Sequence, residues 1–305
     1  MPVCIQLMDE KLQKVLADRG HGSRREMERW ISAGRVLVNG ETAHLGQRVA
    51  IDDKIELDGK SLRPTKADRS RVLLLNKPVG LVCTRKDPEG RKTVFDTLPK
   101  LSHGRWITIG RLDIQTSGLL LVTNDGDLAH KMMHPSTGLD REYAVRVDGK
   151  LSDSDLSRLK KGVYIDGELL GFSDLRYYNG SDNNHWYHAV LMEGKNREVR
   201  RLFGDCDIRV SRLKRVRYGP VLLPSVVKRG NSIELGVEDL AGLYKILGLP
   251  FTRPQGKPRR ESKREKSVLI PYPSLKAVTG SGSEETRSGD TRDTEALRKP
   301  GKSKR

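Results

Sequence analysis

The sequence predicts an α+β fold in two parts: a small N-terminal helix–helix–β-ribbon module and a larger domain built on a mainly antiparallel sheet. Beyond residue 72, short apolar runs bounded by turn residues recur close together, whereas helical patterns are few and mostly flank them. Strands that follow one another without regular alternation with helices favour an antiparallel sheet. We expect a small domain at 10–63, a linker at 64–71, a larger domain at 72–250 and a tail at 251–305.

The N-terminal part begins with a short helical pattern at 11–19. A second helix is announced by Ser23 and Glu26, which form a capping-box pattern, and it ends at Gly34. A strand and a hairpin turn follow at 35–40, with further short strands up to residue 57. Three arginines stand near the start of the second helix, where exposed backbone N–H groups favour phosphate: Arg24, Arg25 and Arg29.

The larger domain begins with a buried strand at 72–77 that stops at Pro78. The remaining predicted strands cover residues 81–84, 106–109, 119–123, 143–147, 162–165, 175–178, 187–192, 210–216 and 232–235, and the predicted helices cover 128–133, 153–161, 197–203 and 237–247. After residue 250 the composition becomes basic and polar except for an apolar island at 268–270, so we expect the tail to be disordered.

The chain of 305 residues carries a formal net charge of +17, which favours a polyanionic partner such as nucleic acid. Residues 251–305 hold 15 Lys and Arg against 7 Asp and Glu, so the tail supplies only part of this charge. The spacing of the three cysteines fits neither a zinc site nor a disulfide framework. No run of apolar residues approaches the length of a membrane span. We expect a cytoplasmic protein that contacts no membrane, and a monomer.

A carboxylate and a cation stand together between the predicted strands at 106–109 and 119–123. If Leu112 points inward, alternation places Arg111 and Asp113 on the opposite face, looking into one space. An exposed loop with an ordinary ion pair is the alternative interpretation. Tyr143, on another strand, is a candidate for stacking or for core packing. A strand that turns through Gly194 into a helix carries further cations, which are Lys195, Arg197, Arg200 and Arg201.

Several familiar sites are absent from the sequence. It contains no phosphate-binding loop, no dinucleotide fingerprint and no nucleophile elbow. His185 and His188 flank Trp186 and Tyr187 in a predicted strand, where core or surface roles are favoured over metal ligation. We therefore expect chemistry without a metal or a cofactor. A carboxylate, an aromatic ring and several cations together suggest a site that works on a nucleotide.

Two family resemblances follow from these motifs. Residues 11–16, 22–26 and 34–40, with Gly46 and Val49, are similar to the small RNA-binding module named after the fourth small-subunit ribosomal protein. The larger domain resembles the pseudouridine synthases that modify bacterial ribosomal RNA. Its resemblance rests on NKPVG at 76–80, RKDPEG at 85–90, TVFD at 93–96, GRLD at 110–113 with Thr116, GLLL at 118–121, HP at 134–135, REY at 141–143 and EGKNREVRR at 193–201.

The resemblance implies isomerisation of a uridine in large-subunit ribosomal RNA, with Asp113 as nucleophile or sugar-directed base. It implies that Arg111 fills the stack left by the flipped uridine, that Tyr143 stacks on the base and that Arg200 is the cation paired with Asp113. A buried carboxylate acting at the sugar, and a base removed from its stack, are consistent with these residue types. Two alternatives stay open: the same chemistry on small-subunit rRNA, and a non-catalytic RNA-binding factor in ribosome assembly.

Overall fold

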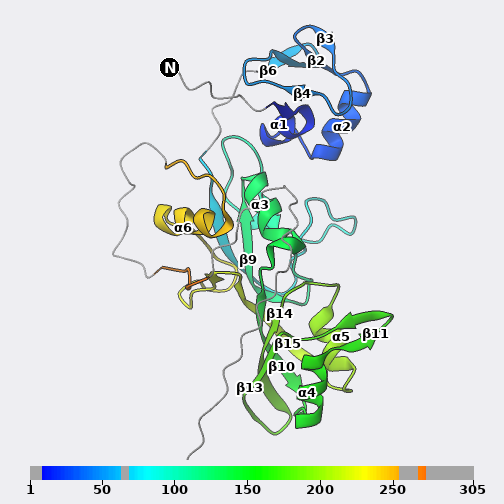
Figure 1. Cartoon of the computed structure of the whole chain (residues 1–305), viewed down its shortest axis with the longest axis vertical. Coiled ribbons are helices and arrows are strands. Elements are labelled where there is room, and N and C mark those ends of the chain that lie inside the picture. The colour runs from blue at the N-terminus through cyan, green and yellow to red at the C-terminus, as the bar shows by residue number, and fades with distance from the viewer. Residues whose placement is uncertain (1–8, 63–68, 254–266, 273–305) are drawn as a thin grey trace, which may run out of the picture.

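The computed structural model describes residues 9–62, 69–253 and 267–272 (Figure 1). The N-terminal helices and short strands gather at one end of the molecule, and the large sheet with its flanking helices occupies the rest. This arrangement confirms the predicted α+β class. Residues 64–68 of the predicted linker lie outside the described residues, whereas Arg71 donates its backbone N–H to the side chain of Asn124 at 2.7 Å.

The N-terminal unit folds as two helices followed by a β-ribbon. Both hydrogen bonds of the capping box predicted from Ser23 and Glu26 are present, and they satisfy N–H groups that the helix start would otherwise leave free. Leu12, Met27 and Ile55 are buried in its core. Its elements are β1 (Glu10–Lys11), α1 (Leu12–Asp18), α2 (Arg24–Ser32), β2 (Val36–Val38), β3 (Glu41–Thr42), β4 (Arg48–Val49), β5 (Ile55–Leu57) and β6 (Lys60–Leu62).

The larger unit is built on a nine-stranded sheet, in which the strands follow the order β13-β14-β10-β15-β9-β7-β17, with β16 beside β15 and β8 beside β9. Every strand pair is antiparallel except β9 and β15, which run parallel. The strands are β7 (Val72–Lys77), β8 (Ile107–Ile109), β9 (Ser117–Thr123), β10 (Arg141–Asp148), β13 (Asp174–Ser181), β14 (Asn184–Leu191), β15 (Arg209–Tyr218), β16 (Val221–Leu222) and β17 (Ser232–Glu234), and a separate hairpin joins β11 (Val163–Ile165) to β12 (Glu168–Leu170).

Alternate residues of the sheet enter two separate cores. Along β9, Leu120 and Val122 pack in one core, whereas Leu119 and Leu121 pack in the other, as the period of two requires. The first core contains residues of α4 and α5, and the second contains residues of α3 and α6. The helices of this unit are η1 (Val94–Thr97), α3 (Gly126–Met133), η2 (Pro135–Thr137), α4 (Asp153–Lys161), α5 (Glu198–Gly204) and α6 (Val237–Leu247).

Two sequence predictions about this unit are wrong. The predicted strand at 81–84 is a loop that makes a single bridge between Val82 and Thr93, because no neighbouring strand offers it a longer ladder. The prediction of a disordered tail fails for residues 267–272, which are described and folded. Leu269 bridges to Val221 of β16, and Val268 and Leu269 pack on the second core, so this short island buries enough apolar surface to fold back. The rest of the tail beyond residue 253 lies outside the described residues.

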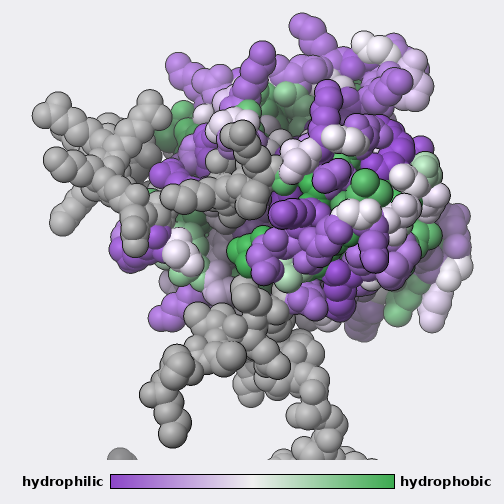
Figure 2. Space-filling model, turned by 90° about the horizontal axis from the view of Figure 1, so that it is seen from above, coloured by the Kyte–Doolittle hydropathy of each residue, from purple (hydrophilic) through white to green (hydrophobic). Residues whose placement is uncertain are grey.

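Viewed from the end that carries the N-terminal unit, the surface is dominated by hydrophilic side chains, with hydrophobic residues visible in smaller areas between them (Figure 2). This agrees with the mean hydropathy of −0.59. Among the described residues, no helix is long and apolar enough to cross a membrane.

Candidate active site

A cleft of about 720 Å³ opens where β10 and β15 meet the loops that precede β9 and α5. Arg111, Asp113 and Tyr143 all line it, so the structure brings the segment that carries Arg111 and Asp113 together with the strand that carries Tyr143. Leu112 is buried while Arg111 and Asp113 are exposed, which confirms the expected alternation. No ion pair joins Arg111 to Asp113 in the described part of the chain, so the interpretation of an ordinary surface pair is wrong.

Asp113 begins a tight turn in which its carbonyl oxygen accepts the Thr116 N–H at 2.9 Å. Beneath the turn, the fully buried Lys77 ends β7 and directs its ammonium at three carbonyl oxygens, those of Pro78, Asp113 and Thr116, at 3.0, 3.2 and 2.9 Å. Burial lowers the pKa of Lys77, and the nearby charge of Asp113 partly offsets this effect. The main chain that carries Asp113 is therefore held from below.

Arg200 does not form the expected hydrogen bond with Asp113. Its guanidinium donates to the carbonyl oxygens of Val210 and Gln115, at 2.8 and 3.2 Å, because the start of α5 lies beside the turn rather than in front of the carboxylate. Burial lowers the pKa of Arg200, and the charge of Asp113 acts in the opposite direction, so the two groups are electrostatic neighbours. Arg200 thus braces the same turn two residues after Asp113.

The carboxylate of Asp113 is exposed rather than buried, which corrects the sequence expectation. The cleft is open on one side, so Asp113 faces the space in which a substrate would lie. Tyr143, by contrast, is only 8% exposed and packs with the first core while its surface lines the cleft. Both interpretations of this tyrosine, core packing and a face toward ligand, are therefore realised at once.

Arg215 is a cleft residue that the sequence analysis missed. It stands opposite Tyr143 on the neighbouring strand and is only 3% exposed. Its Nε donates to the carbonyl oxygen of Leu119 at 2.7 Å, and its Nη2 is buried with no hydrogen-bond partner. Strand alternation places Arg215 on the same face as the buried Leu213, and a charged residue on a buried face is a signal that could have found it.

The other predicted cations near α5 divide into two groups. Lys195 and Arg197 line the cleft, and Arg197 adopts a left-handed conformation with φ of 49°. Arg201 does not reach the cleft but binds the β11–β12 hairpin, where it pairs with Asp166 at 3.1 Å and Glu168 at 2.6 Å. Arg201 therefore fastens that hairpin to α5.

The three arginines of α2 are all exposed, but they lie in two different environments. Arg25 and Arg29 line a shallow depression of the N-terminal unit together with Gly46. Arg24 faces the larger unit instead, with its Nη2 4.0 Å from a carboxylate oxygen of Asp127 in α3.

The described residues contain no group of three or more His, Cys, Asp or Glu side chains able to hold a metal ion. The cleft instead combines an exposed carboxylate, an aromatic ring and five cationic side chains, and such a set suits a phosphate-bearing nucleotide. The cations of the cleft are Arg111, Arg141, Lys195, Arg197 and Arg215.

Comparison with known proteins agrees with this geometry. Residues 71–204 match the model of the RNA pseudouridylate synthase family, and residues 10–55 match that of the S4 domain. The chain is similar to the ribosomal large subunit pseudouridine synthase B of Escherichia coli strain K12, with 50% identity over 247 residues that cover 80% of this chain and 85% of the relative. The chain belongs to the RNA pseudouridylate synthase family.

Two further relatives of the same name extend the comparison for this pseudouridine synthase. The protein of Haemophilus influenzae is 49% identical over 266 residues, covering 86% of this chain and 74% of the relative. The protein of Pseudomonas aeruginosa is 54% identical over 243 residues, covering 79% of this chain but only 63% of the relative. A solved structure described as a crystal structure of pseudouridylate synthase has the same fold, with a TM-score of 0.54 and 24% identity over 76% of this chain and 99% of that one.

Proposed function

We propose that this chain isomerises uridine to pseudouridine at a defined position of large-subunit ribosomal RNA, with Asp113 as the catalytic carboxylate. The single observation that carries the proposal is Asp113 itself, exposed in a cationic cleft beside Tyr143 on a turn fixed by Lys77. The substrate follows from the relatives, which are named ribosomal large subunit pseudouridine synthase B.

The reaction exchanges one bond for another within a single nucleotide. The bond between the sugar C1′ and the uracil N1 breaks, the ring turns, and a bond forms between C1′ and C5. The proton displaced from C5 is balanced by the one that N1 carries in the product, so atoms and electrons balance without a co-reactant. Asp113 acts at the sugar, either by bonding to C1′ or by accepting a sugar proton, until the new bond forms.

The neighbouring residues have distinct roles in this proposal. The target base leaves its stack, as bases must for chemistry inside a helix, and Tyr143 provides the aromatic surface on which it rests. Arg111, exposed on the rim of the cleft, fills the space that the base leaves. Arg200 positions Asp113 through the carbonyl of Gln115. Arg215 supplies a buried positive charge at the cleft, and its Nη2 has no hydrogen-bond partner within the protein.

RNA outside the target nucleotide contacts cations of both units. The proposed contacts are Arg25 and Arg29 in the depression of the N-terminal unit, and Lys195 and Arg197 at the cleft. We place the domain boundaries at 10–63 and 72–250, and we propose a cytoplasmic monomer that needs no cofactor. Arg24 and Arg201 are proposed to contact RNA less directly, since both face carboxylates of the protein.

The test replaces Asp113 by Asn. Pseudouridine is mapped in rRNA from cells that lack the gene, and from the same cells supplied with either the wild-type chain or Asp113→Asn. Loss of one large-subunit pseudouridine with Asp113→Asn, and its return with the wild-type chain, is the expected result. Asp52→Asn, an exposed change in the N-terminal unit, serves as a control that keeps full activity. Purified Asp113→Asn is expected to bind the RNA about as tightly as the wild type.

Two outcomes would contradict the proposal. An active Asp113→Asn variant would show that the carboxylate of Asp113 is not required for the reaction. An unchanged pseudouridine pattern in cells without the gene, together with defective ribosome assembly, would favour the non-catalytic factor. A change confined to small-subunit rRNA would keep the chemistry and correct the substrate.

A further inference from the structure

One face of the large sheet is left open where β10, β13, β14 and β15 run together. Inward-facing residues of these strands, such as Val145 and Tyr187, are fully buried in the first core with α4 and α5. The residues between them on β10, β13 and β14 belong to neither core of the larger unit. Figure 1 shows α4, α5 and the β11–β12 hairpin beside this part of the sheet. We call the opposite side the open sheet face, defined by Arg146, Tyr178, Trp186, His188, Arg212 and Lys214.

The strand register places these side chains in a regular array. Trp186 of β14 pairs with Arg146 of β10, and Arg146 pairs in turn with Arg212 of β15. Two residues along, the next row runs from His188 across Ala144 to Lys214. Each row thus has an aromatic ring on one strand and a cation two strands away.

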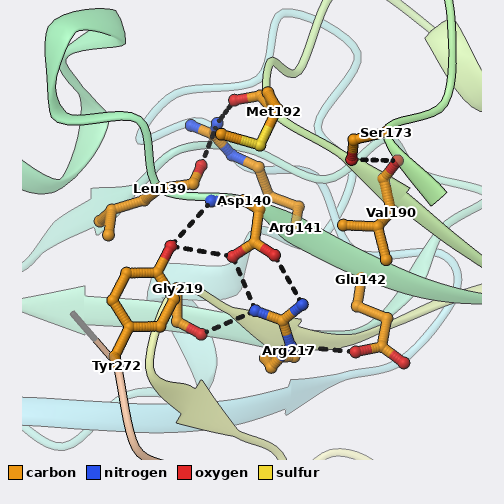
Figure 3. Close-up of polar contacts among 10 residues, drawn as sticks. All are labelled: Leu139, Asp140, Arg141, Glu142, Ser173, Val190, Met192, Arg217, Gly219 and Tyr272. Carbon is orange, nitrogen blue, oxygen red and sulfur yellow. Dashed lines mark hydrogen bonds and ion pairs between the residues drawn. The ribbon is translucent and has the colours of Figure 1, made fainter. Parts of the chain in front are cut away.

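The cations of the open sheet face exceed its carboxylates. Neither Arg212 nor Lys214 forms an ion pair in the described part of the chain, and Arg146 donates from its Nε to the neutral hydroxyl of Ser211 at 3.0 Å. The carboxylates near the face are already neutralised. Glu142 accepts a hydrogen bond from Arg217 at 2.9 Å, as Figure 3 shows. The other carboxylate oxygen of Glu142 lies 2.7 Å from Nδ1 of His188.

The remaining carboxylates lie at the margins of the face. Asp174 pairs with Arg176 at 2.6 Å, and Asp148 pairs with Arg209 at 3.0 Å. The array therefore keeps a net positive charge that its own neighbours do not cancel, and an anionic partner complements it.

The aromatic side chains on this face are available for stacking. Tyr178 is 69% exposed, and its ring lies 5.6 Å from that of His188 at an interplanar angle of 58°, while Trp186 is half-buried beside them. Flat rings on an exposed sheet, with cations beside them, form the kind of surface on which unpaired bases stack while phosphates contact the cations. A double helix keeps its bases stacked inside and offers these rings no partner.

The open sheet face is separate from the cleft. None of its six residues lines the cleft, and Tyr143, which does, points to the opposite side of β10 from Arg146. We propose that the open sheet face binds an unpaired segment of the RNA substrate while the target uridine occupies the cleft. The inference rests on the proposed function for the identity of the RNA, because the face itself recognises only single-stranded nucleic acid.

The experiment measures how the full chain binds a 12-nucleotide polycytidine RNA, which has no uridine to occupy the cleft. Arg212→Ser/Lys214→Ser is expected to weaken binding and to reduce the slope of log affinity against log salt by about 1.4, at about 0.7 for each lost phosphate contact. Tyr178→Ser is expected to weaken binding about tenfold and to leave the slope unchanged. The matched control is Lys228→Ser/Arg229→Ser, which removes two exposed cations from a loop elsewhere and is expected to alter neither quantity.

Ultraviolet cross-linking of the same RNA locates the contact directly, with cross-linked peptides expected from β13 and β14. Unchanged RNA affinity and salt slope in Arg212→Ser/Lys214→Ser would overturn the inference. The same result is expected if the face binds an acidic protein instead of RNA. Failure of the proposed function would give a different result. The wild type would then form no pseudouridine, whereas its binding to polycytidine would be unaffected.

Discussion

Replacing Lys77 by Met tests whether the turn that carries Asp113 is held from below. The substitution keeps the length of the buried stem but removes the ammonium from the carbonyl oxygens of Pro78, Asp113 and Thr116. All three carbonyls lose the ammonium, but that of Asp113 keeps its bond to the Thr116 N–H, so only those of Pro78 and Thr116 are left unpaired. At about 1–3 kcal/mol for each buried polar group left unpaired, the gross cost is about 2–6 kcal/mol.

Part of that cost is returned. Burial lowers the pKa of Lys77 because removing its charge from water is unfavourable, and the uncharged Met side chain avoids this penalty. We therefore expect a loss of about 2–4 kcal/mol in the free energy of unfolding, measured by urea titration. Because Asp113 shifts with its turn, kcat is expected to fall by about tenfold to a hundredfold, with a smaller change in KM.

Lys92→Met is the matched control, since Lys92 is exposed and the substitution is expected to stay within about 0.5 kcal/mol of the wild type. If the free energy of unfolding of Lys77→Met also lay within about 0.5 kcal/mol of the wild type, and its kcat were unchanged, the ammonium would have no part in holding the turn.

Three further predictions follow from other contacts. Gly118→Ala is expected to unfold the larger unit or to destabilise it by more than about 3 kcal/mol, because φ is +100° there and a Cβ would lie 2.2 Å from a backbone oxygen of β15; a soluble variant with normal thermal unfolding would refute this. Burial alone would raise the pKa values of Asp140 and Glu142, but Arg217 holds that of Asp140 below its ordinary 3.8, and His188 together with Arg217 holds that of Glu142 below its ordinary 4.5. The stabilisation is therefore present above those values and lost as pH falls below them, so the stability gap between the wild type and Arg217→Met is expected to narrow as the pH is lowered from about 6 to 3, and a gap independent of pH would contradict it. Ser23→Ala removes a helix cap and is expected to cost about 1 kcal/mol in urea unfolding; no change would show that the cap contributes nothing.

The sequence was most informative where one local signal determined the structure. The helices at 153–161 and 237–247 have the predicted bounds, and the capping box at Ser23 forms as expected. The alternation around Leu112 likewise placed Arg111 and Asp113 on the same side. These features depend on neighbours within a few residues, so periodicity and capping chemistry suffice to predict them.

The remaining features depend on contacts between distant segments. Arg200 was expected to pair with Asp113, yet the approach of α5 to the turn directs its guanidinium to Gln115. Strand alternation could have placed Arg215 on a buried face, but its position opposite Tyr143 follows only from the pairing of β10 with β15. The island at Leu269 folds because β16 offers it a free edge, and composition alone does not report an edge.

The parallel contact between β9 and β15 affects how late during synthesis the active site can form. It joins Ser117 to Lys214, and at about 5–20 residues per second the ribosome needs on the order of 5–20 s to extend the chain from one to the other. Throughout that interval the residues of the Asp113 turn have been synthesised but β15, which completes the cleft, has not. Non-local pairings of this kind also form slowly, since the loop between them must close first. Catalytic competence therefore arises in one late step, once the final third of the larger unit has emerged, rather than growing with the length of the chain.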